Sequence, residues 1–437
     1  MKYAHQLSDM FNAFSPEPLN IDQLAEFYCT DTMEQRMSDK YTSPMEDIFD
    51  LCQEGRADAA FLLLGHRGCG KSTELNRLSE RFLSAGHPVK TIQCSVDLDL
   101  LNMAHADLFI LMAEALVALA AELHCDIGAD TLSRIETFWA AGTESWTTQE
   151  AKGASIEAGL STKTPGILST VLALFVDMKA DLKYNEEKRT EYRKTLNVRT
   201  SEWVQLLRTV AAHIAQETGG KQPVLIFEDL DKLNPEDAWK VFYHYAAILS
   251  GMPFPVIYTF PIALSYDPRF SAMESYFIIK TLPMIKIETI EGQPFQEGIQ
   301  VIKKIVKKRA KVSLFDSQVL ETIIQYTGGS LRDLFHSINT AAKRAQRRGA
   351  AAVSMEDADR ALEELQTSLT RRIEADDYDF LTNIYNGNKE RIQEKERLLK
   401  LLQASVVLEY NGKRWHNVHP LVVKFLRRQE IITDDRA

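Results

Sequence analysis

Residues 65–73 read GHRGCGKST and follow the apolar run AFLLL at 60–64. The spacing fits the phosphate-binding pattern G-x-x-x-x-G-K-[ST], in which backbone N–H groups surround the phosphates and the lysine contacts the outer ones. The Ser72 hydroxyl would then bind Mg²⁺. Apolar residues recur at helical spacing over 72–83, so a helix N-terminus should face the anion. The predicted nucleotide-contacting residues are Gly65, His66, Arg67, Gly68, Cys69, Gly70, Lys71, Ser72 and Thr73.

A second candidate group follows the apolar run VLIF at 224–227, where the chain continues EDLDK. Nucleotide hydrolysis needs carboxylates beside the phosphate loop, one to orient Mg²⁺ and one to activate the attacking water. We assign Glu228 to the metal, together with Ser72, and Asp229 to the water, with Asp231 close behind. An aspartate reaches less far toward this water than a glutamate, so hydrolysis should be slow, as suits a switch rather than a motor.

Two further residues complete the predicted catalytic set. Thr259 lies near the end of the apolar run PVIYTF at 255–260, where a polar side chain can contact the γ-phosphate or the attacking water. Arg332, in TGGSLRDLF at 327–335, starts a helix after two glycines and would fold onto the phosphates as the domains close. The plainer alternatives are a threonine that only favours a strand and an arginine on the surface.

The elements that must position these residues follow from the hydrophobic pattern. Strands are predicted at 60–64, 89–96, 224–227 and 255–260, with a fifth inside 277–287. Helical stretches lie between them, which predicts an α/β domain with a parallel sheet. The long gap before the third strand predicts a helical insertion at about 100–205, with an apolar helix near its start and a basic helix that carries Arg189, Arg193 and Arg199. It either buries its apolar side against the sheet or serves oligomerisation or partner binding.

Four regions follow along the chain. The prediction is an N-terminal helical segment at 1–57, a P-loop domain at 58–290, a helical lid at 291–368 and a winged-helix-like domain at 369–437. In the lid, apolar residues recur at i, i+3 and i+4, and Ser354 with Asp357 resembles a capping box. In the last region, the helical run that starts at residue 390 precedes two strand-like runs around Asn411-Gly412, a strong hairpin signal.

Composition limits the classes of function. The chain has 437 residues, 45% hydrophobic and 26% charged, and a net charge of −10, which argues against a surface that binds nucleic acid throughout. The charge is about −15 over 1–295 and about +5 over 296–437, so a polyanion would meet the C-terminal third. The five scattered cysteines indicate neither a disulfide framework nor a zinc site, and they favour a reducing cytoplasm. A redox role for Cys69 is a minor alternative.

Membrane and export signals are also missing from the pattern. The first residues, MKYAHQLSDMF, have no basic region followed by an apolar stretch, so we expect no signal peptide. The longest apolar run, at 167–176, is about half of what a membrane span needs. We therefore expect a soluble protein without a membrane partner.

Together these motifs resemble the AAA+ and STAND group of ATPases, and within it the branch shared with the Orc/Cdc6 initiators. GHRGCGKST is similar to the Walker A motif and VLIFED to Walker B; Thr259 matches sensor 1, and GGSLRD resembles the lid motif with the sensor 2 arginine, Arg332. The resemblance covers about 58–365, with a C-terminal winged helix. Two features depart from the pattern: the Glu–Asp order and the long insertion. Arg269 is a positional guess for an arginine finger.

The resemblance implies an ATP- and Mg²⁺-dependent switch that assembles with itself or controls an effector or sensor protein, as many bacterial STAND-like ATPases do in anti-phage defence. The alternative is a DNA-binding initiator or loader that uses its winged helix. Two basic stretches, KKIVKKRAK at 303–311 and KRAQRR at 343–348, would support DNA binding, unless they are only the solvated faces of lid helices. A kinase acting on a small molecule is a third reading, for which the sequence offers no evident substrate pocket.

Overall fold

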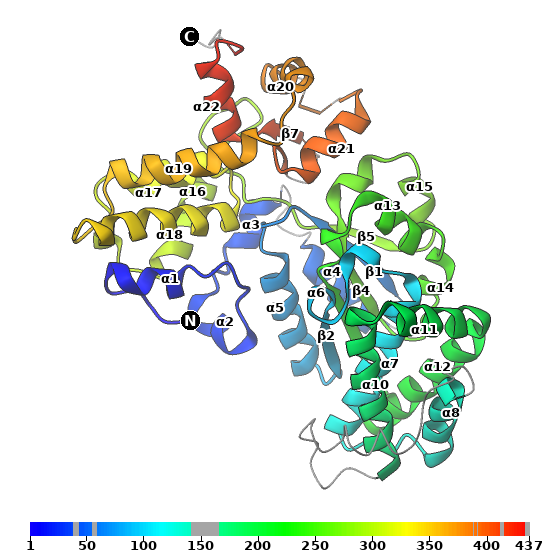
Figure 1. The fold of residues 1–437 in the computed structure, drawn as a ribbon. Coiled ribbons are helices and arrows are strands. Elements are labelled where there is room, and N and C mark those ends of the chain that lie inside the picture. Colours follow the sequence, from blue (N-terminus) through cyan, green and yellow to red (C-terminus); the bar gives the residue numbers. More distant parts are fainter. Residues whose placement is uncertain are drawn as a thin grey trace.

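The computed structural model describes residues 1–37, 43–54, 59–140, 166–387, 389–390, 392–410 and 415–432. Figure 1 shows a sheet domain, a helical lid beside it and a small C-terminal unit above the junction of the two. Residues 141–165 of the predicted insertion and the Asn411-Gly412 turn lie outside the described residues.

A parallel five-stranded sheet forms the centre of the sheet domain. Its strands are β1 (Ala60–Gly65), β2 (Val89–Gln93), β3 (Val224–Glu228), β4 (Val256–Pro261) and β5 (Ile278–Thr281). Their order is β2-β3-β4-β1-β5, and every neighbouring pair is parallel. β1, β3 and β4 are buried along their whole length, because helices cover both faces, and they therefore read as unbroken apolar runs. The predicted α/β fold is confirmed.

One strand is shorter than predicted. β2 ends at Gln93, because its partner β3 ends at Glu228, the residue paired with Gln93. The chain then turns into the short helix α6 (Cys94–Asp97) instead of continuing as a strand to residue 96. β5 lies within the predicted stretch 277–287 and pairs with β1 over four residues.

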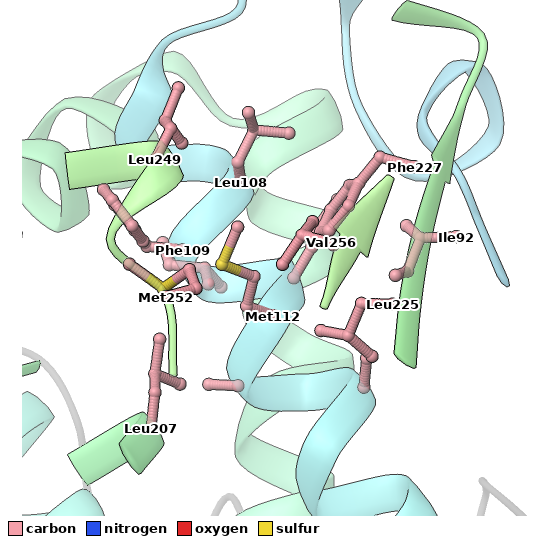
Figure 2. Close-up of a cluster of buried hydrophobic side chains, with 14 of the residues drawn as sticks. Ile92, Leu108, Phe109, Met112, Leu207, Leu225, Phe227, Leu249, Met252 and Val256 are labelled. Carbon is pink, nitrogen blue, oxygen red and sulfur yellow. The ribbon is translucent and has the colours of Figure 1, made fainter. Parts of the chain in front are cut away.

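Helices cover the two faces of the sheet. α4 (Pro44–Gln53) and α5 (Lys71–Ser84) pack on one face, in a core that includes Phe61 and Leu63 of β1. The other face carries α7 (His105–Glu122), which also contacts α12 (Thr200–Glu217). Figure 2 shows Phe109 and Met112 of α7 in the same buried cluster as Leu225 of β3. These contacts fix the C-terminal strand ends, where the candidate residues lie.

The insertion is helical in the part that is described. It contains η2 (Leu100–Asn102), α7, α8 (Ala129–Ala140), α10 (Gly166–Tyr184), α11 (Glu186–Val198) and α12. Its large apolar residues, such as Trp139 and Trp203, belong to the same core as the sheet. Arg189 and Arg193 of the predicted basic helix form ion pairs with Asp99 and Asp107, and Arg199 follows the end of α11. The insertion thus buries its apolar side against the sheet.

Short helices connect β3, β4 and β5. They are η3 (Leu230–Lys232), α13 (Pro235–Ala238), the π-helical turn η4 (Trp239–Tyr243), α14 (Ala246–Ser250), η5 (Ile262–Tyr266) and α15 (Phe270–Met273). Across the described ranges, no helix combines the length and the apolar character that a membrane crossing needs.

The lid consists of α16 (Gln296–Lys307), η6 (Val312–Leu314), α17 (Val319–Tyr326), α18 (Leu331–Arg347) and α19 (Met355–Thr370). The predicted capping box is confirmed: Ser354 accepts from the Asp357 N–H, and the Asp357 side chain accepts from the Ser354 N–H. The N-terminal segment supplies η1 (Leu7–Asp9), α1 (Met10–Ala13), α2 (Ile21–Phe27) and α3 (Thr32–Arg36). η1 and α1 pack on α18, α2 on α5 and α3 on α16, so the segment joins the lid to the sheet domain.

The C-terminal unit contains η7 (Ala375–Asp377), α20 (Tyr378–Tyr385), α21 (Lys395–Gln403), the strands β6 (Val407–Tyr410) and β7 (Trp415–Val418), and α22 (Pro420–Arg428). β6 and β7 form an antiparallel hairpin. The helix predicted from residue 390 begins only at Lys395. The backbone carbonyl of Lys389, just before this helix, accepts a hydrogen bond from the backbone N–H of His416 at 2.9 Å. This bond holds this part of the chain against the hairpin.

Candidate functional site

The loop between β1 and α5 is shaped by two glycines. Gly68 and Gly70 have φ values of +84° and +98°, in the left-handed region that residues with a Cβ rarely adopt. α5 begins directly after Gly70, so its unpaired first-turn N–H groups and the positive end of its dipole lie at the loop. A Cβ added at Gly68 would lie only 2.7 Å from the Cβ of Arg332. Glycine here therefore also permits the close approach of the lid.

A cavity of about 250 Å³ lies between this loop and the lid. Six of the nine predicted nucleotide-contacting residues line it: Arg67, Gly68, Gly70, Lys71, Ser72 and Thr73. Gly65, His66 and Cys69 do not line it, and the His66 and Cys69 side chains are buried in the surrounding protein. Residues 67–68 and 70–73 thus form one wall of the cavity.

Lys71 is held by oxygen atoms on three sides. Its ammonium lies 2.9 Å from Asp231 Oδ2 and donates to the carbonyls of Gly65 at 2.6 Å and His66 at 2.9 Å. The lysine and aspartate side chains are only 6% and 10% exposed. Burial by itself would lower the pKa of Lys71, but the Asp231 carboxylate outweighs it and the pKa is raised. The same pairing lowers the pKa of Asp231 against the opposing effect of burial. Lys71 is therefore a fixed positive charge.

Glu228, at the end of β3, is buried beside Ser72 and is 5% exposed. Burial raises the pKa of Glu228 to about 7; the Asp229 and Asp231 carboxylates add to this rise, and a hydrogen bond with Ser72 opposes it. A bound cation would favour the charged carboxylate. The hydroxyl and the carboxylate are hard oxygen ligands, and Mg²⁺ usually takes only one or two protein carboxylates, together with phosphates and waters. The pair fits that role.

A protein-only metal cage would need a different ligand set. Within the described part of the chain, no group of three or more histidine, cysteine, aspartate or glutamate side chains is placed to hold a metal ion.

Asp229 lines the cavity in a left-handed backbone conformation, with φ of +71°. Both of its carboxylate oxygens have partners: Ser95 of α6 donates to Oδ2, and Lys232 Nζ lies 2.6 Å from Oδ1. The turn after β2 brings Ser95 to this position. The structure therefore places the three carboxylates of EDLD around one end of β3, each in a different environment.

Thr259 also lines the cavity, but its hydroxyl is engaged with the backbone around Asp229. It donates to the Phe227 carbonyl at 3.2 Å and accepts from the Leu230 N–H at 3.0 Å. It thus holds the end of β3 in place. Arg269, the positional guess for an arginine finger, does not line the cavity; it binds Asp267 at 2.7 Å and its guanidinium lies 4.6 Å from the Trp239 ring centroid.

Arg332 enters the cavity from the lid, in the first turn of α18. The Leu331 N–H donates to the Gly68 carbonyl at 3.0 Å, which fixes the start of this helix on the phosphate loop. The structure therefore brings together Lys71, Asp229, Thr259 and Arg332 from four separate elements.

Sequence reasoning missed the part of the site that comes from the N-terminal segment. Arg36 of α3 is buried and donates to the Cys69 carbonyl and to the Pro283 carbonyl, both at 2.6 Å. Tyr28 donates to Glu74 of α5 at 3.1 Å. Both residues line the cavity. A single arginine in a short polar helix has no motif around it, so nothing in the sequence could have identified it.

Apolar side chains of the N-terminal segment and the lid also line the cavity. Phe27 comes from the N-terminal segment, and Ile305 and Phe335 come from the lid. The guanidinium of Arg309 lies 4.9 Å from the Phe335 ring centroid. The wall formed by the N-terminal segment and the lid thus combines these apolar side chains with the charged Arg36 and Arg309.

The chain matches no protein-family model, and no curated protein matches its sequence. Among solved structures, it is similar to the ORC2 protein of Aeropyrum pernix in its ADPNP–ADP complexes, with 11% identity, coverage of 96% of this chain and 97% of the other, and a TM-score of 0.40. A Walker-type ATPase of Pyrococcus abyssi matches with 15% identity, 95% and 99% coverage and a TM-score of 0.44. The A. pernix ORC1 protein in complex with DNA matches with 11% identity, 92% and 97% coverage and a TM-score of 0.40.

Proposed function

We propose that this chain is a Mg²⁺-dependent ATPase that acts as a molecular switch, coupling its nucleotide state to self-assembly or to control of a partner protein. The observation that carries the proposal is the convergence of Lys71, Asp229 and Arg332 on one cavity from the phosphate loop, the end of β3 and the lid. Such a constellation suits a phosphorylated ligand whose charge changes on hydrolysis.

The charged and the apolar residues that line the cavity suit the phosphates and the base of ATP. Lys71, Arg67 and the N-terminus of α5 supply positive charge for the phosphates. Phe27 and Phe335 offer apolar surface for a base. Ser72 and Glu228 would hold Mg²⁺, which neutralises charge on the phosphates when it is bound.

Asp229 is the proposed acceptor of the proton from the attacking water. Ser95 and Lys232 engage its two oxygens, so an attacking water must compete with these contacts for the carboxylate. Thr259 keeps the backbone around it in place. Slow hydrolysis follows from this environment as well as from the short aspartate side chain.

Arg332 supplies the switch. Its guanidinium would gain a charge-assisted contact with a triphosphate that is weaker with a diphosphate, so the lid would differ in position between the two states. All five cysteines are free, as is usual in a reducing cytoplasm, where we place the protein. An effector partner and a role in anti-phage defence are proposed on the resemblance of the motifs alone.

DNA binding is the weaker alternative, because partners inside the chain already engage much of the basic surface of the lid. Lys303 pairs with Glu321 at 2.9 Å, and Lys304 pairs with Asp31. The hairpin strands β6 and β7 are buried in the protein. If the chain binds duplex DNA tightly and its affinity falls steeply as salt is added, DNA binding becomes the favoured function.

The test compares the size of the protein in ATP with Mg²⁺ and in ADP by light scattering. Wild type should change size between the two nucleotides, whereas Arg332→Ala should bind ATP and keep one size. Arg344→Ala is the matched control, because Arg344 lies on the same helix in an exposed ion pair with Glu364, and it should behave as wild type. One unchanging size for all three proteins would contradict the assembly switch.

A further inference from the structure

The C-terminal hairpin is built into the core of the sheet domain. Leu408 and Tyr410 of β6 and Trp415 of β7 belong to the same buried cluster as Leu63 of β1 and Leu75 of α5. Tyr410 and Trp415 stack on each other with their ring centroids 4.7 Å apart. The two strands therefore pack directly behind the phosphate loop.

One hydrogen bond joins the hairpin to the phosphate loop itself. The backbone N–H of Glu409 donates to Nε2 of His66 at 2.8 Å. His66 is 1% exposed, and burial, with smaller contributions from Lys71 and His416, lowers its pKa to about 3. The imidazole therefore stays neutral at physiological pH, and Nε2 remains a hydrogen-bond acceptor.

The hairpin also contacts the lid, just before Arg332. The Tyr410 hydroxyl donates to the Gly328 carbonyl at 2.7 Å. A Cβ added at Gly328 would lie 2.6 Å from Cδ1 of Leu408 and 3.1 Å from Cδ of Pro420. The glycine, at φ of +62°, thus lets the hairpin approach the turn that leads into α18.

Contacts at the boundary between the sheet domain and the lid complete the connection. Asn417 of β7 donates to the carboxylate of Glu288. Lys389 donates to the Ile290 carbonyl at 2.7 Å. The C-terminal unit therefore touches the phosphate loop, the segment that links sheet and lid, and the turn that positions Arg332.

We propose that the β6–β7 hairpin is a positioning element of the nucleotide site, with His66 and Tyr410 as positioning residues that tie the phosphate loop and the lid to the C-terminal unit. The inference rests on the proposed function. A lid that moves relative to the phosphate loop must break the hydrogen bond between the Leu331 N–H and the Gly68 carbonyl. It must also break or carry along the Tyr410 contact, while the His66 contact stays with the loop. The C-terminal unit thus acts as the output of the switch rather than as an independent module.

The test measures amide hydrogen exchange of β6 and β7, and the affinities for ATP and ADP, in wild type and Tyr410→Phe. In wild type, exchange of the hairpin should differ between ATP with Mg²⁺ and ADP. Tyr410→Phe keeps the buried ring and removes only the hydroxyl, and it should change the ratio of ATP to ADP affinity by about two- to tenfold, the range expected for one buried hydrogen bond.

The matched control is Tyr385→Phe, because the Tyr385 hydroxyl accepts from Arg427 within the same C-terminal unit; its affinity ratio should equal that of wild type. A second pair of variants tests the loop contact: His66→Gln retains an acceptor near the position of Nε2 and should keep ATP affinity that His66→Leu loses.

The outcomes separate the two proposals. If wild type binds ATP but its hairpin exchanges identically in both nucleotides, and Tyr410→Phe leaves the affinity ratio unchanged, the positioning role is wrong and the ATPase proposal stands. If wild type binds neither nucleotide, the proposed function fails, and the inference that rests on it fails too.

Discussion

Replacing Lys71 with alanine should destabilise the folded chain as well as remove a phosphate contact. The sequence alone suggests a lysine that only meets phosphate, whose loss would leave the fold intact. In the structure, the Lys71 ammonium lies 2.9 Å from Asp231 Oδ2, and both side chains are almost fully buried. Alanine would leave the Asp231 carboxylate buried without its countercharge. Removal of one partner of a buried pair typically costs about 3–5 kcal/mol.

The cost should depend on pH, with a sign that follows from the pKa of Asp231. In wild type this pKa lies below its ordinary value of 3.8, so the pair stabilises the fold above about pH 4 and its contribution is lost as pH falls further. Without Lys71, burial is opposed by the smaller effects of Arg67 and Lys232 on the pKa of Asp231. We therefore expect this pKa to rise, so that the variant is relatively stable at low pH and loses stability as pH rises. The destabilisation by Lys71→Ala should therefore grow between about pH 5 and pH 7.5, by up to about 1.4 kcal/mol per pH unit.

Thermal unfolding at the two pH values measures this effect. A loss of about 3 kcal/mol corresponds to a decrease in Tm of about 6–12 °C for a cooperative unit of 150–250 residues. The double variant Lys71→Ala/Asp231→Asn removes the unpaired charge and should regain most of the lost Tm. Lys90→Ala, at an exposed pair with Glu122, is the control for loss of a surface lysine. The reasoning is refuted if the double variant is no more stable than Lys71→Ala, or if the deficit is the same at both pH values.

Two further predictions concern the carboxylates at the end of β3. Because burial raises the pKa of Glu228 to about 7, a proton competes with Mg²⁺, and Mg²⁺-dependent ATP affinity should fall about tenfold from pH 8 to pH 6. Calorimetric titration should show this dependence in wild type but not in Glu228→Gln, and an equal pH dependence in both would rule Glu228 out. Asp229→Asn should bind ATP and lose turnover in a phosphate-release assay, because an amide cannot accept the proton of the attacking water. If Asp229→Asn hydrolyses ATP normally and Asp231→Asn does not, Asp231 and not Asp229 accepts the proton of the attacking water.

The sequence predicts the features of this fold that are local. The apolar run at 60–64 before GHRGCGKST identifies β1 and the phosphate loop, because buried parallel strands are apolar on both faces. The lid helices follow from their 3.6-residue period. The end of β2 at Gln93 was not predictable in this way, because it depends on where its neighbour β3 stops. The position of Ser95 against Asp229 follows from that early end.

No local sequence pattern predicts the contacts that hold the phosphate loop from outside. Arg36 reaches the Cys69 carbonyl from 33 residues upstream, and the Glu409 N–H reaches His66 from 343 residues downstream. Neither contact has a sequence motif. An arginine can bind a carbonyl, and a backbone amide can bind an imidazole, without any fixed spacing between the residues. Only the tertiary fold brings these partners together.

The Arg36 and Glu409 contacts connect the phosphate loop to the N-terminal segment and to the C-terminal hairpin. Loss of the Arg36 guanidinium would leave the buried carbonyls of Cys69 and Pro283 without a donor, and loss of the hairpin would leave the buried Nε2 of His66 without one. Each unmet buried group costs about 1–3 kcal/mol. Because these groups flank one phosphate loop, its geometry depends on both ends of the chain. Loss of the Arg36 contacts or of the hairpin should therefore alter nucleotide binding through the geometry of this loop.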